Sequence, residues 1–266
     1  MTDRQKFSVL RNARRVWAIG AIHAEVDRLD RLHAALWSRV QTCDRVIYLG
    51  NMVGRGVASR ETIDSLLDFR IAVLARPHSD VNDVVYLRGG QEEMWQKLLQ
   101  LQFAADPRGV LEWMIAQGVG ATLQSYGISP EEALREASAG TLALTRWTGR
   151  LRQAVQAAPG HYQLMGSLRR AAYTDDGSLL FVNTGLDPAR PLEAQSDSFW
   201  WNSGRFHEIT APYGAFRRIC RGFDPNHAGF QMTDYTATLD AGCGFGGRLM
   251  AACLTPDGAV IERIEA

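Results

Sequence analysis

The chain has 266 residues, 46% of them hydrophobic and 22% charged, which is typical of a soluble globular protein with one large domain, residues 1–266, and argues against disorder. Its 29 Lys and Arg balance its 29 Asp and Glu, so no net charge draws it to nucleic acid or to an anionic membrane. It has neither the roughly 18 consecutive apolar residues of a spanning helix nor a signal-peptide pattern, and its four cysteines lack zinc-site or disulfide spacing; we expect a cytoplasmic protein with reduced thiols.

The first half of the chain alternates predicted strands with predicted helices. Buried strands are expected at 14–20, 45–50 and 84–89. Each is followed by a segment with apolar residues at helical spacing, at 24–40, at 59–76 with Ser59 as the N-cap, and at 91–103. Strands that alternate with helices in this way predict a mainly parallel sheet with helices packed on it.

The second half changes from helical to strand periodicity. Residues 106–160 have a helical pattern broken by Pro and Gly, which predicts an inserted helical cap. After Gly160 the period becomes two, which predicts a hairpin around Asp175–Gly177, strands at 217–223 and 235–241, and a last hairpin around Pro256–Gly258. The whole is one α/β domain whose second half is mostly β.

Three glycine-rich loops follow the first three predicted strands. They read GAIHA (20–24), GNMVGRG (50–56) and GGQEE (89–93), and because the carboxyl ends of parallel strands share one edge, these loops should converge. Their residues resemble the motifs GDxHG, GDxVDRG and GNH(D/E) of metallophosphoesterases of the phosphoprotein phosphatase type. That family includes serine/threonine phosphatases and bacterial diadenosine tetraphosphatases.

Three later segments continue the resemblance in the same order. LLFVNTGLDPARPL (179–192) is similar to the family's strand and loop FVHAGL, ICRGFDP (219–225) to its GH-x-P loop, and TLDAGCGFGGRL (238–249) to its closing segment. The matches span nearly the whole chain. The resemblance implies a calcineurin-like, four-layer αββα sandwich of two mixed β-sheets flanked by helices, with the helical insert at about 106–160.

The side chains that give this family its chemistry are mostly absent. The resemblance places a metal histidine on His23 and the phosphate-binding arginine on Arg55, and both are kept. The family's metal aspartates fall on Ala21 and Asn51, its two later metal histidines on Asn183 and Phe223, and its catalytic GNH and DR positions on Gly90, Gln91 and Gly54. We therefore expect no competent catalytic residue at Gly54 or Gln91, and His23, Asn51 and Asn183 as remnants of a metal site.

The loss matters because two divalent cations a few ångströms apart repel each other. A bridging carboxylate and other anionic ligands normally offset that repulsion, whereas Asn51 offers one neutral carbonyl and Ala21 offers nothing. Without the metals, water keeps a pKa of about 15.7 and no hydroxide nucleophile forms at neutral pH. We expect no metal cofactor, and two-metal phosphoester hydrolysis that is absent or very weak.

Several side chains near these loops have two interpretations each. His23 is either a remnant ligand or simply hydrogen-bonded to its neighbours. Arg55, joined by Arg88 and Arg221, is either a phosphate-binding group, since a guanidinium matches phosphate oxygens, or part of a structural salt bridge.

Nearby acids leave a relocated single-metal site open, with manganese or another divalent ion held by His23, Glu92, Asp224 or His227. Other acids lie close in sequence, namely Glu25, Asp27, Glu93 and Asp187. The alternative is that such acids complement helix dipoles, which fits Glu92 and Glu93 well.

A glycine-rich segment and an aromatic run each have a functional and a structural interpretation. GCGFGG, 242–247, formally matches GxGxxG, but a dinucleotide fingerprint must open a helix, and here a hairpin follows. Within it, Cys243 is either oxidisable or a small buried thiol. The aromatic run at Ser198–Trp201 and the helix at 91–103 supply apolar surface for the core or for an interface.

The resemblance, together with the missing metal ligands, leaves three possible functions. The leading one is a cytoplasmic pseudophosphatase that binds a phosphorylated protein, a nucleotide or a partner protein, with Arg55 as anion contact and the insert capping the cleft. The second is an active phosphatase or dinucleoside polyphosphate hydrolase with a relocated single-metal site. The third is a pure protein-interaction module.

Overall fold

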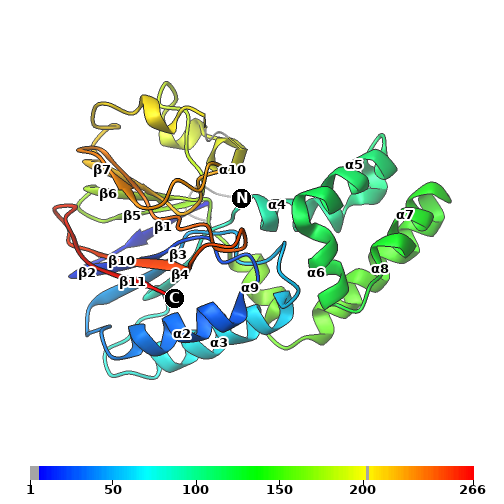
Figure 1. Cartoon of the computed structure of the whole chain (residues 1–266), viewed down its shortest axis with the longest axis horizontal. Coiled ribbons are helices and arrows are strands. Elements are labelled where there is room, and N and C mark those ends of the chain that lie inside the picture. Colours follow the sequence, from blue (N-terminus) through cyan, green and yellow to red (C-terminus); the bar gives the residue numbers. More distant parts are fainter. Residues whose placement is uncertain (1–5, 202–203) are drawn as a thin grey trace.

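The computed structural model describes residues 6–201 and 204–266, and in it two β-sheets pack face to face with helices outside them (Figure 1). One sheet has five strands in the order β11-β10-β2-β3-β4, and the other has six in the order β1-β5-β6-β7-β9-β8. The helices α2 and α3 cover the outer face of the five-stranded sheet (Figure 1). The predicted arrangement of two mixed sheets flanked by helices is confirmed.

The five-stranded sheet contains the three strands predicted in the first half. They are β2 (Arg15–Ile19), β3 (Asp44–Tyr48) and β4 (Val84–Tyr86), and they run parallel. The terminal hairpin, β10 (Met250–Leu254) and β11 (Val260–Glu265), joins antiparallel to β2. In β2, Val16 and Ala18 face the other sheet while Trp17 and Ile19 face the helices, which is why this strand is apolar at every central position.

The six-stranded sheet is built mostly from the second half. The predicted hairpin is β5 (Ala171–Thr174) with β6 (Leu179–Val182), and β7 (Arg218–Arg221) and β9 (Thr236–Thr238) follow in parallel with β6. Two short edge strands were not predicted, β1 (Phe7–Leu10) and β8 (Gln231–Met232). β1 pairs in parallel with the distant β5, and so short a strand leaves little periodicity in the sequence.

The helices over the five-stranded sheet are α2 (Val26–Trp37) and α3 (Ser59–Leu74), while α4 (Gly90–Leu98) leads into the insert. The prediction that Ser59 is an N-cap is wrong. Ala58 occupies that position, and the Ser59 hydroxyl instead lies 3.2 Å from the Thr122 hydroxyl of the insert. The predicted helix at 91–103 also ends early, at Leu98, with a separate 3-10 turn at Leu101–Phe103.

The insert is a group of helices that projects to one side of the sandwich (Figure 1). It contains α5 (Pro107–Met114), a π-helical turn (Ile115–Val119), α6 (Gly120–Ser125), α7 (Pro130–Ser138) and α8 (Thr141–Ala157). Its own core centres on Trp147 and Leu151 and is continuous with Trp95 of α4. The expected change to strand periodicity directly after Gly160 is wrong, because α9 (His161–Ser167) follows; Gly160 turns the chain at φ 78° without ending the helical region.

Short elements cover the outer face of the six-stranded sheet. They are the 3-10 turns Leu192–Ala194 and Phe206–Glu208 and the helix α10 (Ser198–Trp201). Phe199 and Trp200 are buried there, whereas Trp201 is 46% exposed. The aromatic run therefore serves mainly as core.

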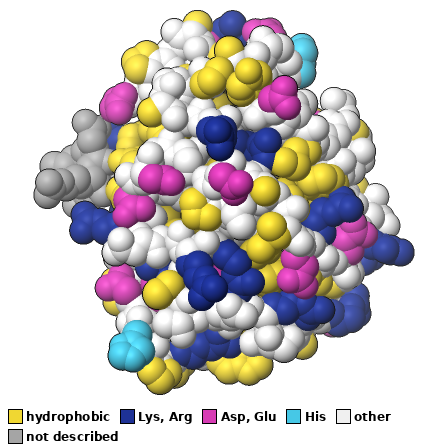
Figure 2. Space-filling view, turned by 90° about the vertical axis from the view of Figure 1, so that its left-hand side faces the viewer, with side chains coloured by type: hydrophobic (Ala, Val, Ile, Leu, Met, Phe, Trp, Pro, Cys, Tyr) yellow, Lys and Arg dark blue, Asp and Glu magenta, His cyan; other side chains and the backbone are white. Residues whose placement is uncertain are grey.

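The face of the molecule at the left of Figure 1 carries Lys and Arg side chains mixed with Asp and Glu (Figure 2). Ion pairs at the start of β2 and β3 join Arg15 to Asp44 and Arg45 to Asp83. Lys and Arg are the more prominent in the lower half of the view, with Asp and Glu interspersed (Figure 2). Within the described residues, no helix combines the length and apolar character that crossing a membrane requires.

Candidate ligand-binding site

The three glycine-rich loops converge at one edge of the five-stranded sheet, as the sequence predicts. The backbone N–H groups of Ile22 and His23 both donate to the carbonyl oxygen of Asn51, at 2.9 and 2.8 Å. The second and third loops are equally close, since a Cβ placed on Gly50 would lie 2.6 Å from the nitrogen of Gly89. Glycine is required at position 50, where φ is +84° as well.

Loops of the six-stranded sheet meet the same edge. The amide of Ala21 donates to the carbonyl oxygen of Gly222 at 2.9 Å. The side chain of Asn183, after β6, donates from Nδ2 to the carbonyl oxygen of Leu49 at 2.7 Å. The site is therefore assembled from segments that are far apart in the sequence and belong to both sheets.

A cavity of about 270 Å³ lies where these loops meet. It brings together seven positions that the sequence singled out near these loops, which are His23, Asn51, Arg55, Gly90, Gln91, Phe223 and His227. Its remaining walls come from residues that the sequence did not assign to this site: Met94, Gln117, Thr184, Trp200, Trp201, Pro225 and Phe245. Motif spacing carries no signal for these because they belong to α4, the insert, α10 and the later loops.

The insert forms part of the wall directly. Gln91 donates from Nε2 to the carbonyl oxygen of Gln117 at 2.9 Å, and the amide of Arg55 donates to the carbonyl oxygen of Gly118 at 3.1 Å. Gly118 has φ 110°, inside the π-helical turn. The irregular turn of the insert thus contacts the loop that carries Arg55.

His23 is buried in an aromatic cage beside the cavity. It is 1% exposed, and its ring lies 5.5 Å from that of Phe223 and 5.3 Å from that of Phe245, both edge-on. Neither ring nitrogen has a hydrogen-bond partner among the described residues, so the interpretation that neighbours hydrogen-bond it is not met. Burial, and to a smaller extent the charges of Arg55 and His227, lower the pKa of His23 to about 3, which keeps the imidazole neutral.

The two asparagines at metal-ligand positions are engaged with the protein itself. Asn51 Oδ1 accepts a hydrogen bond from the backbone N–H of Gln91 at 3.1 Å. Asn183 is fully buried, and its Oδ1 accepts from the Thr184 hydroxyl at 2.9 Å while its Nδ2 holds Leu49. Both side-chain amides therefore connect loops, and their oxygen atoms are already engaged in hydrogen bonds and are poorly placed to coordinate an ion.

These donors do not fit the two-metal centre that the fold suggests. Ala21 has no ligand atom, and Phe223 presents a ring that packs on His23. In the described part of the chain no three His, Cys, Asp or Glu side chains are grouped closely enough to hold an ion. The chemistry of the residues, one neutral imidazole and two amides, supplies none of the negative charge that adjacent cations need.

The residues at positions 54 and 91, where the sequence analysis expected no competent catalytic residue, are in direct contact. A Cβ on Gly54 would lie 2.0 Å from Oε1 of Gln91. The Gln91 side chain therefore fills the space that a larger residue at position 54 would need, and φ at Gly54 is +84°. An acid placed at position 54 would require Gln91 to move.

Glu92 organises the second loop, a role that the sequence analysis missed. It is 1% exposed, and its carboxylate accepts backbone N–H bonds from Asn51 at 2.8 Å, Met52 at 2.7 Å, Val53 at 3.2 Å and Gly89 at 2.8 Å. Burial raises its pKa while these four bonds oppose the increase. The bond to Gly89 is the capping-box contact of α4, and an acid three residues after a helix-opening glycine is the signal that was available.

The four donors considered for a relocated metal are not brought together. His23 and His227 line the cavity, but Glu92 is committed to the backbone amides. Asp224 pairs with Arg221 at 3.2 Å. Three of the other nearby acids also have partners, with Glu25 beside Arg28, Glu93 beside Arg88 and Lys97, and Asp187 beside Arg190 and Arg205. Asp27 is exposed in the first turn of α2.

The three arginines are likewise separated. Arg88 pairs with Glu93 at 3.0 Å. Arg221 pairs with Asp224 and also stacks on the Phe206 ring. Only Arg55 lines the cavity, with its guanidinium 4.1 Å from the centre of the Phe245 ring. Partial burial lowers the pKa of Arg55, and no carboxylate of the described residues pairs with it, so the salt-bridge interpretation is not met.

Backbone strain concentrates around the cavity. His23, Asn51 and Arg55 have φ values of 53°, 54° and 62°, in the left-handed region that non-glycine residues seldom adopt. Such conformations persist where the surroundings over-determine them, and they cluster at functional sites.

The glycine-rich segment 242–247 forms a turn before β10 and opens no helix, in agreement with the sequence. Within it, Cys243 is buried and its thiol lies 3.1 Å from the carbonyl oxygen of Ile22. Burial raises the pKa of Cys243 to about 12. The buried-thiol interpretation is therefore the supported one.

We predict that His23 makes the fold sensitive to acid. The pKa of His23 in the folded protein, about 3, lies below the ordinary histidine value of 6.5, so between these pH values the unfolded chain binds a proton that the folded chain does not. Stability is retained above pH 6.5 and falls by about 1.4 kcal/mol for each unit between there and the folded pKa. In His23→Asn the free energy of unfolding, measured with urea, should depend less steeply on pH in that window. The difference in slope from the parent should correspond to about one proton.

Asparagine suits the left-handed backbone at position 23, and His78→Asn is the matched control, since His78 is exposed and has φ 63°. An unchanged slope in His23→Asn would contradict the buried neutral imidazole.

No family model and no curated protein matches this chain. Solved structures do. A protein provisionally assigned as a diadenosine tetraphosphatase is 19% identical, with 98% of each chain covered and a TM-score of 0.58. A serine/threonine protein phosphatase from Saccharomyces cerevisiae is 14% identical, covering 99% of this chain and 85% of its own, with a TM-score of 0.52. The predicted metallophosphoesterase fold is thereby confirmed.

Proposed function

We propose that this protein is a cytoplasmic pseudophosphatase that binds a phosphorylated ligand in the cavity beside His23 and Arg55 without two-metal hydrolysis. The proposal rests on one observation: the fold is intact, but the positions where the resemblance implies metal ligands lack available ligand atoms. Ala21 and Phe223 offer no ligand atom, and the Asn51 side chain is hydrogen-bonded to Gln91. The binding partner is a phosphorylated protein, a nucleotide or a partner protein.

The electrostatics of the cavity favour an anion over cations. The lining residues include no Asp or Glu, while Arg55 contributes a positive charge and His23 is neutral at physiological pH. A cation placed there would meet Arg55 without a compensating carboxylate. A phosphate group would find a planar guanidinium with several N–H donors.

The first test is ligand binding by Arg55. Inorganic phosphate and phenyl phosphate should raise the melting temperature of the native protein in a concentration-dependent way, because a ligand that binds only the folded state stabilises it. Arg55→Gln should weaken this binding by roughly tenfold, since a hydrogen bond to a charged group contributes about 1.5 kcal/mol. Arg60→Gln is the matched control, because Arg60 is exposed, also faces an aromatic ring, and does not line the cavity.

The second test is turnover. With manganese added, purified protein should hydrolyse p-nitrophenyl phosphate no faster than a preparation of Asn51→Ala. Efficient turnover that disappears in the Asn51 variant would reject the pseudophosphatase assignment. Equal stabilisation of native and Arg55→Gln protein by phosphate would reject the assigned anion contact while leaving the loss of hydrolysis standing.

The alternatives make different predictions. An active hydrolase with a relocated single-metal site requires a stoichiometric metal by elemental analysis of the purified chain, and its donors would have to leave the partners described above. A pure protein-interaction module requires that no phosphate compound stabilises the fold. We favour the phosphate-binding function because Arg55 is left without a carboxylate partner at the cavity.

A further inference from the structure

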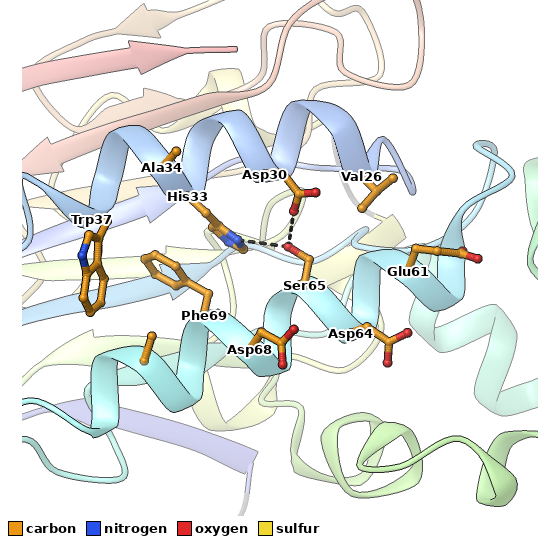
Figure 3. Close-up of a pocket in the computed structure, with 11 residues that line it drawn as sticks. Val26, Asp30, His33, Ala34, Trp37, Glu61, Asp64, Ser65, Asp68 and Phe69 are labelled. Atoms are coloured by element: carbon orange, nitrogen blue, oxygen red, sulfur yellow. Dashed lines mark hydrogen bonds between the residues drawn. The ribbon is translucent and has the colours of Figure 1, made fainter.

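A second concave surface lies between α2 and α3, on the side of these helices away from the sheets (Figure 3). This groove of about 750 Å³ is lined only by residues of the two helices. The helices run side by side in the same direction, with Val26 and Glu61 at one end and Trp37 at the other (Figure 3). The groove is therefore a feature of the fold's outer layer and does not belong to the cavity at Arg55.

The groove is strongly negative. Four carboxylates line it, those of Asp30, Glu61, Asp64 and Asp68, and the lining includes no Lys or Arg. Glu61 and Asp68 have no ion-pair partner among the described residues. The protein as a whole has a net charge of zero, so this concentration of one sign produces a local field that attracts cationic groups.

The groove also presents apolar surface. The His33 and Phe69 rings stack at 4.1 Å to form part of its floor. Trp37, at one end, is 46% exposed although the Arg76 guanidinium stacks on its ring at 4.0 Å, and Ala34 lines the groove with a single methyl group, which leaves space above the floor. Exposed aromatic surface bordered by charged groups is typical of binding sites for other proteins.

The polar cluster in the groove is not arranged for nucleophilic catalysis. The Ser65 hydroxyl donates to Asp30 at 2.6 Å and lies 3.1 Å from His33 Nδ1, as the dashed lines in Figure 3 show. The other ring nitrogen of His33 is engaged with the Tyr48 hydroxyl at 2.7 Å, and burial lowers the pKa of His33 to about 4. A serine bonded to the acid beside so weak a base is not activated, so the groove is a surface for binding.

We propose that the groove binds an extended, cationic segment of a partner protein. From Glu61 to Ala72 the helix rises by about 17 Å, which an extended peptide of about five residues spans. Lys or Arg side chains of that segment pair with the carboxylates, and one apolar side chain packs against Trp37. Charge complementarity favours this occupant over a second copy of the chain, because the chain as a whole has no net positive charge.

The experiment is a fluorescence-anisotropy titration with a labelled synthetic peptide that has several Arg residues beside one Leu. The full-length protein should bind it, with affinity that falls as salt is raised, and should not bind the same peptide with Gln in place of Arg. The double variant Glu61→Gln with Asp68→Asn should bind about fivefold more weakly. Ala34→Arg, which places a cation inside the groove, should weaken binding by roughly tenfold or more.

The matched control is the double variant Glu193→Gln with Asp234→Asn, which removes the same charge from exposed positions outside the groove. It should bind like the parent, as should Arg55→Gln, which separates this proposal from the phosphate site. Equal binding by the groove and control variants, or no binding by the parent, would overturn the proposal. Concentration-dependent dimerisation that Ala34→Arg abolishes would assign the groove to a second copy and overturn it too.

Discussion

Glu92→Gln is expected to destabilise the protein by about 3 kcal/mol and Glu92→Ala by about 4 kcal/mol or more. The carboxylate accepts four backbone N–H groups from two loops that meet at the cavity. A buried donor left without a partner costs about 1 to 3 kcal/mol, and alanine leaves four of them. The loss approaches the total stability of an ordinary domain, so Glu92→Ala should accumulate poorly.

Glutamine is the informative variant because it preserves the volume of the side chain. One amide oxygen continues to accept, while the NH₂ group faces backbone donors that it cannot satisfy. Equilibrium urea unfolding measures the difference. Glu61→Gln is the control, since Glu61 also lies in the first turn of a helix but is exposed; it should change stability by less than about 0.5 kcal/mol. Similar losses in both would mean that Glu92 acts only on the helix dipole.

Gly20→Ala is expected to cost about 3 kcal/mol because the two sheets approach each other closely where β2 ends. A Cβ at this position would lie 2.0 Å from the carbonyl oxygen of Leu239, a backbone atom in the other sheet's closing segment. Neither side can yield without displacing the loops that hold His23 and Asn51. Overpacking of this kind costs about 1 to 3 kcal/mol and more where backbone must move.

Thermal unfolding provides the measurement, and the melting temperature should fall by roughly 6 to 12 °C for a chain of this size. Gly149→Ala is the control. Gly149 lies inside α8, where an added Cβ meets nothing within 4 Å, so alanine should stabilise the helix by about 0.5 to 1 kcal/mol. A neutral Gly20→Ala would mean that the sheets separate more easily than this geometry implies.

Much of the site was visible in the sequence because its loops follow strongly patterned elements. The apolar runs of β2 and β3 and the helical spacing of α2 are local signals, and glycine-rich loops at parallel strand ends must share one edge. The convergence of His23, Asn51 and Arg55 followed from these signals. The resemblance of six ordered segments then predicted the fold that the structural comparisons confirm.

Other predictions depended on contacts that the sequence does not record. Arg88 and Arg221 have the same chemistry as Arg55, yet acids nearby in the chain pair with both and hold them away from the cavity. Ser59 has the residue type of an N-cap, but its hydroxyl meets the insert. For both arginines the partner is an acid a few residues further along the chain, and for Ser59 it belongs to the insert. In each case the contact made in the folded chain determined the outcome, and residue type alone did not predict it.

The sequence by itself determined the order of strands and helices, the strand-end loops, and the presence of Ala21, Asn51 and Phe223 where the resemblance implies metal ligands, because these are properties of residue type and short-range periodicity. Only the tertiary structure decided that Glu92 holds the second loop, that Arg55 alone remains at the cavity, and that α2 and α3 enclose an acidic groove. The physical reason is that burial, hydrogen-bond partners and local charge are set by which segments pack together, and those contacts join residues separated by many tens of positions in the chain.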